Sequence, residues 1–549
     1  MDLSHLARPP FNLDAQALDW VASTFARLSH DQRAAQLFNL NSRGPIDAAA
    51  LAEIAALQPG GLTRFFTSDG GAERAALAGF QNGAEVPLLV SADLEGSRMS
   101  LPFGTPVPNP LALAAADDEA LTRDISATMA KEALSIGVNW SFTPVLDINA
   151  APRSAIVATR GYGSDPARIQ RHALAQLEAF ETAGLAATVK HWPGEGHDDR
   201  DQHLVTTVNP LTMDEWDATH GALYRAAIAS GARAVMSAHI AFPAWVAAQG
   251  ESDPEELYKP ATISHALNIG LLREHLGFNG LIVSDASEMA GLSSVIEGPD
   301  AKVQIIAGGC DMVLFSSDPA AEIAAVARAA ADGTIPTSRF EDAVTRVLGL
   351  KASIGLHRKQ PTPAMPDPST ELAARAFAAA PTLVKDNPGT LPLDPARHRR
   401  ILVVTPGIVE PMNNATIPFL LPNMLKAEGF DVTTAPYGTP LQTEGQDLVL
   451  YLFGEETLLT RGRIFLDWRA LHGHFKTAMS RPWQRMPTVM ISFGYPYYLY
   501  DAPRVPAYIN AYSTHDQMQR AVLEALMGRA AFAGSSPVDP FEGRPEARL

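Results

Sequence analysis

Short apolar runs alternate with alanine-rich amphipathic segments along the first part of the chain. The runs have the length and apolar content of buried strands, and they span residues 87–92, 138–146, 186–189, 233–238, 281–284 and 312–315. Between them, apolar residues recur at three- and four-residue spacing, as in segments 121–136 and 168–183, which predicts helices. Repeated strand–helix units predict an N-terminal (β/α)8 barrel of the TIM type, although the number of regular strands stays open.

The composition changes sharply after His357. Residues 357–369 contain four prolines in a short polar run, which is typical of a linker. A chain of 549 residues also exceeds the size at which one core usually grows. We therefore expect a barrel domain over 1–357, a linker over 358–370 and a smaller α/β sandwich over 371–549. Strand-like runs in the last part cover 401–404, 447–453, 488–493 and 507–512.

A polar loop follows one of the barrel runs and crowds basic, acidic and imidazole groups together. It extends from Lys190 to His203 and reads K-H-W-P-G-E-G-H-D-D-R-D-Q-H. In a parallel α/β barrel, the loops after the strands form the catalytic face. Asp201 lies two positions before His203, so its carboxylate can orient the imidazole and favour the protonated ring. The pair is a candidate proton donor, although a solvated turn would carry the same residue types.

Two further acids stand where apolar runs end. Asp285 follows G-L-I-V-S, and Asp93 follows P-L-L-V-S-A. Carboxylates at the ends of barrel strands lie on the catalytic face. The alternative for Asp285 is an N-cap of the next helix, which is a common use of aspartate after a strand.

These segments resemble glycoside hydrolase family 3, and specifically its β-N-acetylglucosaminidase branch, whose members carry a loop like K-H-F-P-G-H-G followed by an Asp-x-His pair. Further motifs recur in the same order: D-L-E-G-S-R at 93–98, F-T-P-V-L-D at 142–147, T-R-G-Y-G-S-D-P at 159–166, M-S-A-H-I at 236–240 and L-G-F-N-G-L-I-V-S-D at 276–285. Segment 381–393 resembles the start of that family's second domain. The resemblance thus covers nearly the whole chain and implies the same barrel.

The resemblance implies a retaining mechanism with Asp285 as the nucleophile. His203, biased by Asp201, would act as general acid and then as general base. We expect Lys190, Arg160 and protonated His203 to hold the pKa of Asp285 down, because nearby positive charge favours the carboxylate. Asp198 and Asp199 are alternative acids on the same loop.

Five matched positions imply contacts with a sugar. Asp93 would accept hydrogen bonds from hydroxyl groups, while Arg160, Lys190 and His191 would donate them; His239 is the fifth position. Other interpretations stay open, since Arg160 could form a salt bridge at the barrel rim and His191 could be a hydrogen-bonded core histidine.

The sequence departs from the family pattern in two respects. Glu195 stands where the family often has histidine, and Ser100 and Leu101 replace a second arginine that many N-acetylglucosaminidases carry. No adjacent Asp-Glu pair stands at a strand end, which disfavours an acetamido-group nucleophile. His191, His197 and His203 are six residues apart on an irregular loop, so we expect no metal site.

The formal net charge of −17 disfavours nucleic acids and anionic membrane surfaces as partners. The single cysteine, Cys310, excludes an internal disulfide. The N-terminus lacks the basic segment and following apolar core of a signal peptide, and no apolar stretch is long enough for a membrane span. We therefore expect a cytoplasmic protein. A sugar or oligosaccharide is the expected partner, no cofactor is required, and a homodimer remains an option.

We therefore expect a retaining exo-β-N-acetylglucosaminidase that works by double displacement. The same residues would serve a β-N-acetylglucosaminide or β-glucoside phosphorylase, or another β-hexosidase of the family. A neutral imidazole after proton transfer would let phosphate approach with less repulsion. A remote alternative is an inactive sugar-binding protein, but it would not need Asp285, His203 and Asp201 together. We also expect the second domain to buttress the barrel or shape the rim without supplying the acid.

Overall fold

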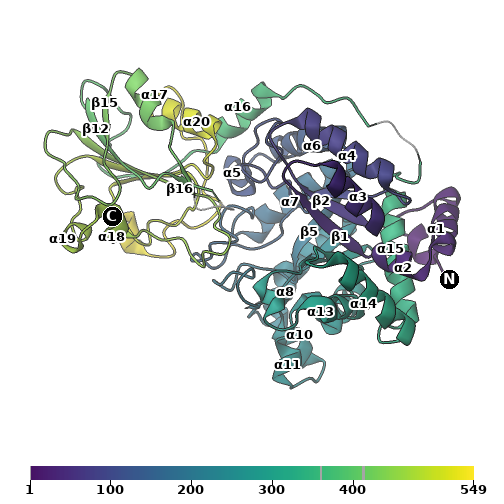
Figure 1. The fold of residues 1–549 in the computed structure, drawn as a ribbon. Helices are drawn as coiled ribbons and strands as arrows, with labels where there is room; N and C mark the ends of the chain where they lie inside the picture. Colours follow the sequence, from purple (N-terminus) through teal and green to yellow (C-terminus); the bar gives the residue numbers. More distant parts are fainter. Residues whose placement is uncertain (1, 359–361, 411–414) are drawn as a thin grey trace.

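Eight parallel strands form a closed barrel in the N-terminal part of the protein (Figure 1). The computed structural model describes residues 2–358, 362–410 and 415–549. Around the barrel, the strands follow the order β1-β2-β3-β4-β5-β7-β9-β10, and β10 closes against β1. Their bounds are β1 (Phe38–Arg43), β2 (Gly61–Phe65), β3 (Leu89–Ala92), β4 (Trp140–Ser141), β5 (Ala186–Trp192), β7 (Ala234–Ser237), β9 (Leu281–Ala286) and β10 (Met312–Leu314). The predicted TIM-type barrel is confirmed.

Helices surround the barrel, and the two that the apolar spacing predicted are present. They are α6 (Glu119–Ile136) and α7 (Pro166–Ala183), each of which begins at an aspartate N-cap and ends at a left-handed glycine. The other α-helices of this part are α1 (Ala15–Arg27), α2 (His30–Ala35), α3 (Ala48–Leu57), α4 (Gly70–Gly83), α5 (Pro110–Ala116), α8 (Met213–Ala218), α9 (His220–Ala229), α10 (Pro243–Ala248), α11 (Pro254–Leu257), α12 (Ala290–Ser293), α13 (Gly298–Ala307), α14 (Pro319–Asp332) and α15 (Thr337–Ser353). Two 3₁₀ helices, Ser4–Ala7 and Ala261–Ile263, and a π-helix, Ala266–His275, are also present. Among the described residues, no helix combines the length and apolar character needed to cross a membrane.

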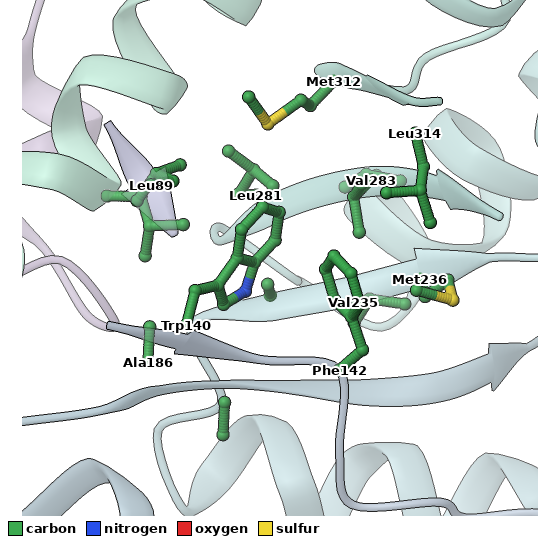
Figure 2. Close-up of a cluster of buried hydrophobic side chains, with 14 of the residues drawn as sticks. Leu89, Trp140, Phe142, Ala186, Val235, Met236, Leu281, Val283, Met312 and Leu314 are labelled. Carbon is green, nitrogen blue, oxygen red and sulfur yellow. The ribbon is translucent and has the colours of Figure 1, made fainter. Parts of the chain in front are cut away.

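The barrel interior is filled by large side chains from facing strands (Figure 2). Trp140 and Phe142 meet edge to face at 4.9 Å, and Leu281, Val283 and Met312 from the opposite wall lie near them. The indole N–H of Trp140 donates to the hydroxyl of Thr188 at 2.7 Å, so its polar atom is satisfied inside the core. The barrel is a packed core whose open end carries the site.

The apolar pattern missed the first two strands because both contain polar residues. The amide of Asn39 on β1 donates to the hydroxyls of Ser91 at 2.9 Å and Thr63 at 3.2 Å, which form a network inside the barrel. Arg64 on β2 is buried against Glu73. Buried polar groups with partners are tolerated, but they interrupt the apolar run that marks a strand.

The second part is an α/β unit built on a largely parallel sheet. Its main strand order is β11-β18-β17-β16-β12-β15, with only β11 antiparallel, and a small β13–β14 hairpin extends it beside β16. Bounds are β11 (Thr382–Asp386), β12 (Arg400–Val404), β13 (Ile408–Val409), β14 (Thr416–Ile417), β15 (Asp431–Thr434), β16 (Leu448–Glu455), β17 (Thr488–Ser492) and β18 (Ala507–Asn510). Figure 1 shows helices α17 (Leu421–Ala427) and α20 (Asp516–Leu526) above this sheet, and α18 (Trp468–His472) and α19 (Phe475–Ala478) below it.

The connection between the two parts includes residues 359–361, which lie outside the described residues. Residues 362–369 form neither helix nor strand, and α16 (Thr370–Ala379) follows them. The hydrophobic cores of the two parts are interleaved: Leu111, Ala112 and Ala115 on α5 belong to the core of the second part. The second part therefore packs on the barrel through shared apolar contacts as well as the chain connection.

Candidate active site

A cavity of about 400 Å³ opens at the carboxyl ends of the barrel strands. Every barrel strand contributes a side chain at or near its end: Arg43, Phe65, Asp93, Phe142, Lys190, Met236, Asp285 and Phe315. Six predicted site residues line the cavity, namely Asp93, Arg160, Lys190, His191, His203 and Asp285. The volume is in the range of small-molecule sites, and the position is the catalytic face of a parallel barrel.

Asp285 lies near the carboxyl end of β9 with its carboxylate at the cavity. Burial alone would raise the pKa of Asp285, but the positive charge of His191, His239 and His203 and the N–H of Ala286 outweigh it and hold the pKa below its ordinary value. The N–H of Ala286 donates to Oδ1 at 2.7 Å. The carboxylate is therefore ionised near neutral pH, as a nucleophile must be.

Lys190, Arg160 and His203 were expected to hold the pKa of Asp285 down together; His203 does so beside His191 and His239, whereas Lys190 and Arg160 are engaged elsewhere. The Nζ of Lys190 lies 2.7 Å from Oδ1 of Asp93 and 2.7 Å from Oε1 of Glu95. Arg160 donates two hydrogen bonds to Glu95, from Nε to Oε2 at 2.8 Å and from Nη2 to Oε1 at 2.9 Å. Burial would raise the pKa of Glu95, but these two cations hold it far below its ordinary range. Glu95 was not predicted, although it stands within the D-L-E-G motif.

His203 and Asp201 form the pair that their spacing predicted. The Nδ1 of His203 lies 2.7 Å from Oδ1 of Asp201, which also accepts the N–H of His203 at 2.8 Å. Asp201 is buried, yet bonds to His203 and to the N–H of Thr460 hold its pKa below the ordinary value. An ionised Asp201 accepts the Nδ1 proton, which leaves Nε2 as the nitrogen for a leaving-group oxygen.

His191 is held by a carboxylate and points its other nitrogen toward Arg160. Its Nδ1 lies 2.6 Å from Oδ2 of Asp147, and its Nε2 lies 3.3 Å from Nη2 of Arg160. Oδ1 of Asp147 also accepts the backbone N–H groups of His191 and Glu195, each at 3.0 Å. Asp147 therefore orients the loop and the imidazole together.

His239 is buried and is not among the residues that line the cavity. Its Nδ1 is 2.8 Å from the hydroxyl of Thr262, and its Nε2 is 3.0 Å from the carbonyl oxygen of Ala286. The residue is fully buried, and both nitrogens are occupied. The predicted sugar contact of His239 is thus replaced by a hydrogen bond to the residue next to Asp285.

Asp147, His191 and Glu195 are the group of potential metal ligands that the described residues bring together, with ligand atoms within 4.8 Å of one another. Asp147 already uses both oxygens in hydrogen bonds, and His191 already uses both nitrogens. Burial and the neighbouring Asp147 raise the pKa of Glu195 well above its ordinary value. A neutral Glu195 would be a weak cation ligand, so the cluster serves hydrogen bonding better than metal binding.

The cavity rim carries groups that the sequence did not reveal. Phe65 and Phe315 lie with ring centroids 6.0 Å apart, and the guanidinium of Arg43 lies 4.1 Å above Phe65. Leu459 and Thr460, from the loop after β16, also line the cavity. The second part of the protein therefore contributes directly to the wall of the site.

Comparison with known proteins gives one family. A family model described as "Glycosyl hydrolase family 3 N terminal domain" matches residues 31–350. The chain is also 37% identical over 569 residues to the beta-N-acetylglucosaminidase/beta-glucosidase of Cellulomonas fimi, covering 99% of this chain and 100% of that protein.

Solved structures match over nearly the full length as well. The beta-glucoside phosphorylase BglX bound to 2FGlc superposes with a TM-score of 0.90 and 32% identity, covering 99% of this chain and 100% of the other. A glycoside hydrolase family 3 beta-N-acetylglucosaminidase from Paenibacillus sp. str. FPU-7 gives a TM-score of 0.81 and 27% identity, covering 93% and 99%. Both domains are included in these matches.

Proposed function

This chain belongs to glycosyl hydrolase family 3, and on that premise we propose that it is a retaining, exo-acting β-N-acetylglucosaminidase. The observation that carries the proposal is the placement of Asp285 and the His203–Asp201 pair at one cavity. Retaining cleavage requires a nucleophile and a separate proton donor at the same glycosidic bond. Phe65, Phe315 and Leu459 also line the cavity and offer apolar surface to the face of a sugar ring.

In the first step, a carboxylate oxygen of Asp285 attacks the anomeric carbon while Nε2–H of His203 protonates the leaving oxygen. The glycosidic C–O bond breaks, an ester to Asp285 forms, and His203 becomes neutral. Asp201 accepts the Nδ1 proton and so keeps the ring oriented with Nε2 free for the leaving oxygen. The neutral ring leaves no negative charge at the acid–base position.

In the second step, the neutral imidazole takes a proton from water as the water oxygen attacks the anomeric carbon. The ester bond to Asp285 breaks, which restores its carboxylate and the protonated His203. Two inversions give overall retention. Asp93, Lys190 and Arg160 would hold the sugar hydroxyls, and charged partners strengthen such bonds. Both ring nitrogens of His191 are already hydrogen-bonded, so this residue would act by holding Arg160. Arg160 and Lys190 both form ion pairs with Glu95, which holds the two cations in position.

Phosphorolysis of β-glucosides is the second candidate, and Arg43 favours it. Its guanidinium lies at the cavity, and no salt bridge engages it within residues 2–358, 362–410 and 415–549. The solved relative BglX is named a beta-glucoside phosphorylase. Phosphate oxygen would replace water in the second step and yield a β-configured glycosyl phosphate, with Arg43 offsetting its charge.

Turnover of p-nitrophenyl β-N-acetylglucosaminide and β-glucoside, measured with and without phosphate, tests both candidates. Hydrolysis of the first substrate at a rate independent of phosphate supports the glycosidase. A glycosyl phosphate detected by ³¹P NMR, with faster steady-state turnover, supports the phosphorylase. Absence of turnover of both substrates would contradict the proposed function.

A further inference from the structure

Five consecutive residues of the second domain, 456–460, cross onto the barrel; we call this segment the strap. It begins where β16 ends. Oε1 of Glu456 accepts a hydrogen bond from the hydroxyl of Ser97 at 2.8 Å, and Oε2 accepts one from the amide of Asn109 at 3.0 Å. The hydroxyl of Thr457 lies 3.1 Å from that of Thr159. Glu456 and Thr457 are buried, so these bonds are shielded from water.

The strap continues along the barrel to the cavity. The N–H of Leu458 donates to the carbonyl oxygen of Ala155 at 3.1 Å, and Leu459 lines the cavity. The strap is therefore anchored at three successive residues before it reaches the site.

The last residue of the strap contacts the acid–base pair. The N–H of Thr460 donates to Oδ2 of Asp201 at 2.9 Å. Oδ1 of the same carboxylate accepts both Nδ1–H and the backbone N–H of His203. Donors at both oxygens fix the rotation of the carboxylate plane, which in turn fixes the ring of His203.

The backbone of Thr460 is in a conformation that this residue type rarely adopts. Its φ is +62°, in the left-handed region, where a β-branched side chain is strained. Such conformations persist only where surrounding structure imposes them, and they concentrate at functional sites. The anchors of the strap supply that constraint.

We propose that the strap makes the second domain a positioning part of the acid–base machinery: the N–H of Thr460 locks the Asp201 carboxylate so that His203 presents Nε2 to the leaving oxygen. This inference rests on the proposed function. The donor itself belongs to the barrel, but its orientation depends on a backbone group from the other domain. Thr460 does not touch the reacting atoms in this role.

The test replaces Thr460 with its α-hydroxy acid analogue, which exchanges the N–H for an oxygen and keeps the side chain. The matched control is the same replacement at Thr439, an exposed residue of the same domain whose N–H makes no hydrogen bond within the described residues. We expect kcat/KM for an alkyl glycoside, whose leaving group needs protonation, to fall roughly tenfold at position 460. The rate for a 2,4-dinitrophenyl glycoside, which needs little protonation, should stay close to that of the control.

Equal loss on both substrates, or loss on neither, would overturn the inference. Thr457→Val, which frees one anchor without touching Asp201, should show the same selective loss on a smaller scale and provides a genetically encoded second variant. His203→Ala serves as the reference. If it shows no selective loss on the alkyl glycoside, the proposed acid is wrong; if it does while the position-460 ester does not, only the role of the strap is wrong.

Discussion

The side-chain amide of Gln202 donates to Oε2 of Glu195 over 3.1 Å. Gln202 stands between Asp201 and His203 in the chain, and its Oε1 accepts the N–H of His239 at 3.0 Å. Gln202 and Glu195 are both buried. The carboxyl group of Glu195 therefore anchors the residue between the two members of the proposed acid–base pair.

Glu195→Gln should be nearly silent in catalysis. Burial and Asp147 raise the pKa of Glu195 well above its ordinary value, which favours the neutral acid. An amide has the same shape and still accepts the bond from Gln202. We expect kcat/KM to change less than about twofold, whereas Glu195→Ala, which leaves the Gln202 amide unpaired, should lower the free energy of unfolding by roughly 1–3 kcal/mol. A large loss of activity in Glu195→Gln would mean that the carboxyl is ionised.

The same residue sets a pH dependence of stability. Its folded-state pKa lies above the ordinary value of 4.5, so the folded protein holds a proton that the unfolded chain releases. The contribution of Glu195 is complete below pH 4.5 and is lost as pH rises toward the folded-state pKa. Glu195→Gln removes this loss, so its melting temperature should exceed that of the wild type at neutral pH and converge with it in acid. A constant difference across this range would contradict the assignment.

Asp285→Asn should lose at least roughly 10³-fold in turnover, because an amide cannot form the glycosyl ester. The variant should still fold and bind a sugar, which thermal denaturation and inhibitor titration would check. A 2-fluoro glycoside should label Asp285 in the wild-type enzyme, as peptide mass spectrometry would show. Near-normal turnover, or a label on another residue, would place the nucleophile elsewhere.

His203→Ala should slow substrates with poor leaving groups far more than activated aryl glycosides. Asp201→Ala should do the same more mildly, since it removes the partner of Nδ1 and leaves the imidazole in place. A series of aryl glycosides with leaving groups of graded pKa measures this dependence directly. A uniform loss across the series would make His203 a binding residue.

Arg43→Met should reduce the acceleration that phosphate gives to turnover, if the enzyme uses phosphate. The charge, rather than the stacking on Phe65, is the relevant property, so Arg43→Lys should retain part of the effect. The measured quantity is the ratio of turnover with phosphate to turnover without it. An unchanged ratio in Arg43→Met would assign the anion contact to another group.

The strands that carry the main chemistry could be predicted because their cores are apolar and their ends are charged. Asp285 and Lys190 follow such runs, and the local spacing of Asp201 and His203 is independent of the fold. Strands β1 and β2 were not predicted, because the polar residues of the network around Asn39 interrupt the apolar pattern. The segment 138–146 shrinks to a two-residue strand, β4, since Pro144 has no N–H for the ladder.

Residues that meet only in three dimensions could not be predicted. Thr460 lies 259 positions from Asp201 in the chain, and its backbone N–H carries no sequence signal at all. Glu95 is visible in the sequence, but its ion pairs with Arg160 and Lys190 require the segments after β3 and β4 to converge on strand β5. His239 follows a strand like the true lining residues, yet the turn after β7 directs its nitrogens to Thr262 and Ala286.

Helix α5 of the barrel domain is also part of the hydrophobic core of the second domain. Leu111, Ala112 and Ala115 lie on a barrel-side helix but are buried in the core of the other domain. A protein expressed only as far as the connection would present this apolar face to water and tend to self-associate. A full-length chain nicked in the connection would behave differently, because the two fragments would remain together as a noncovalent pair with the catalytic cavity still assembled.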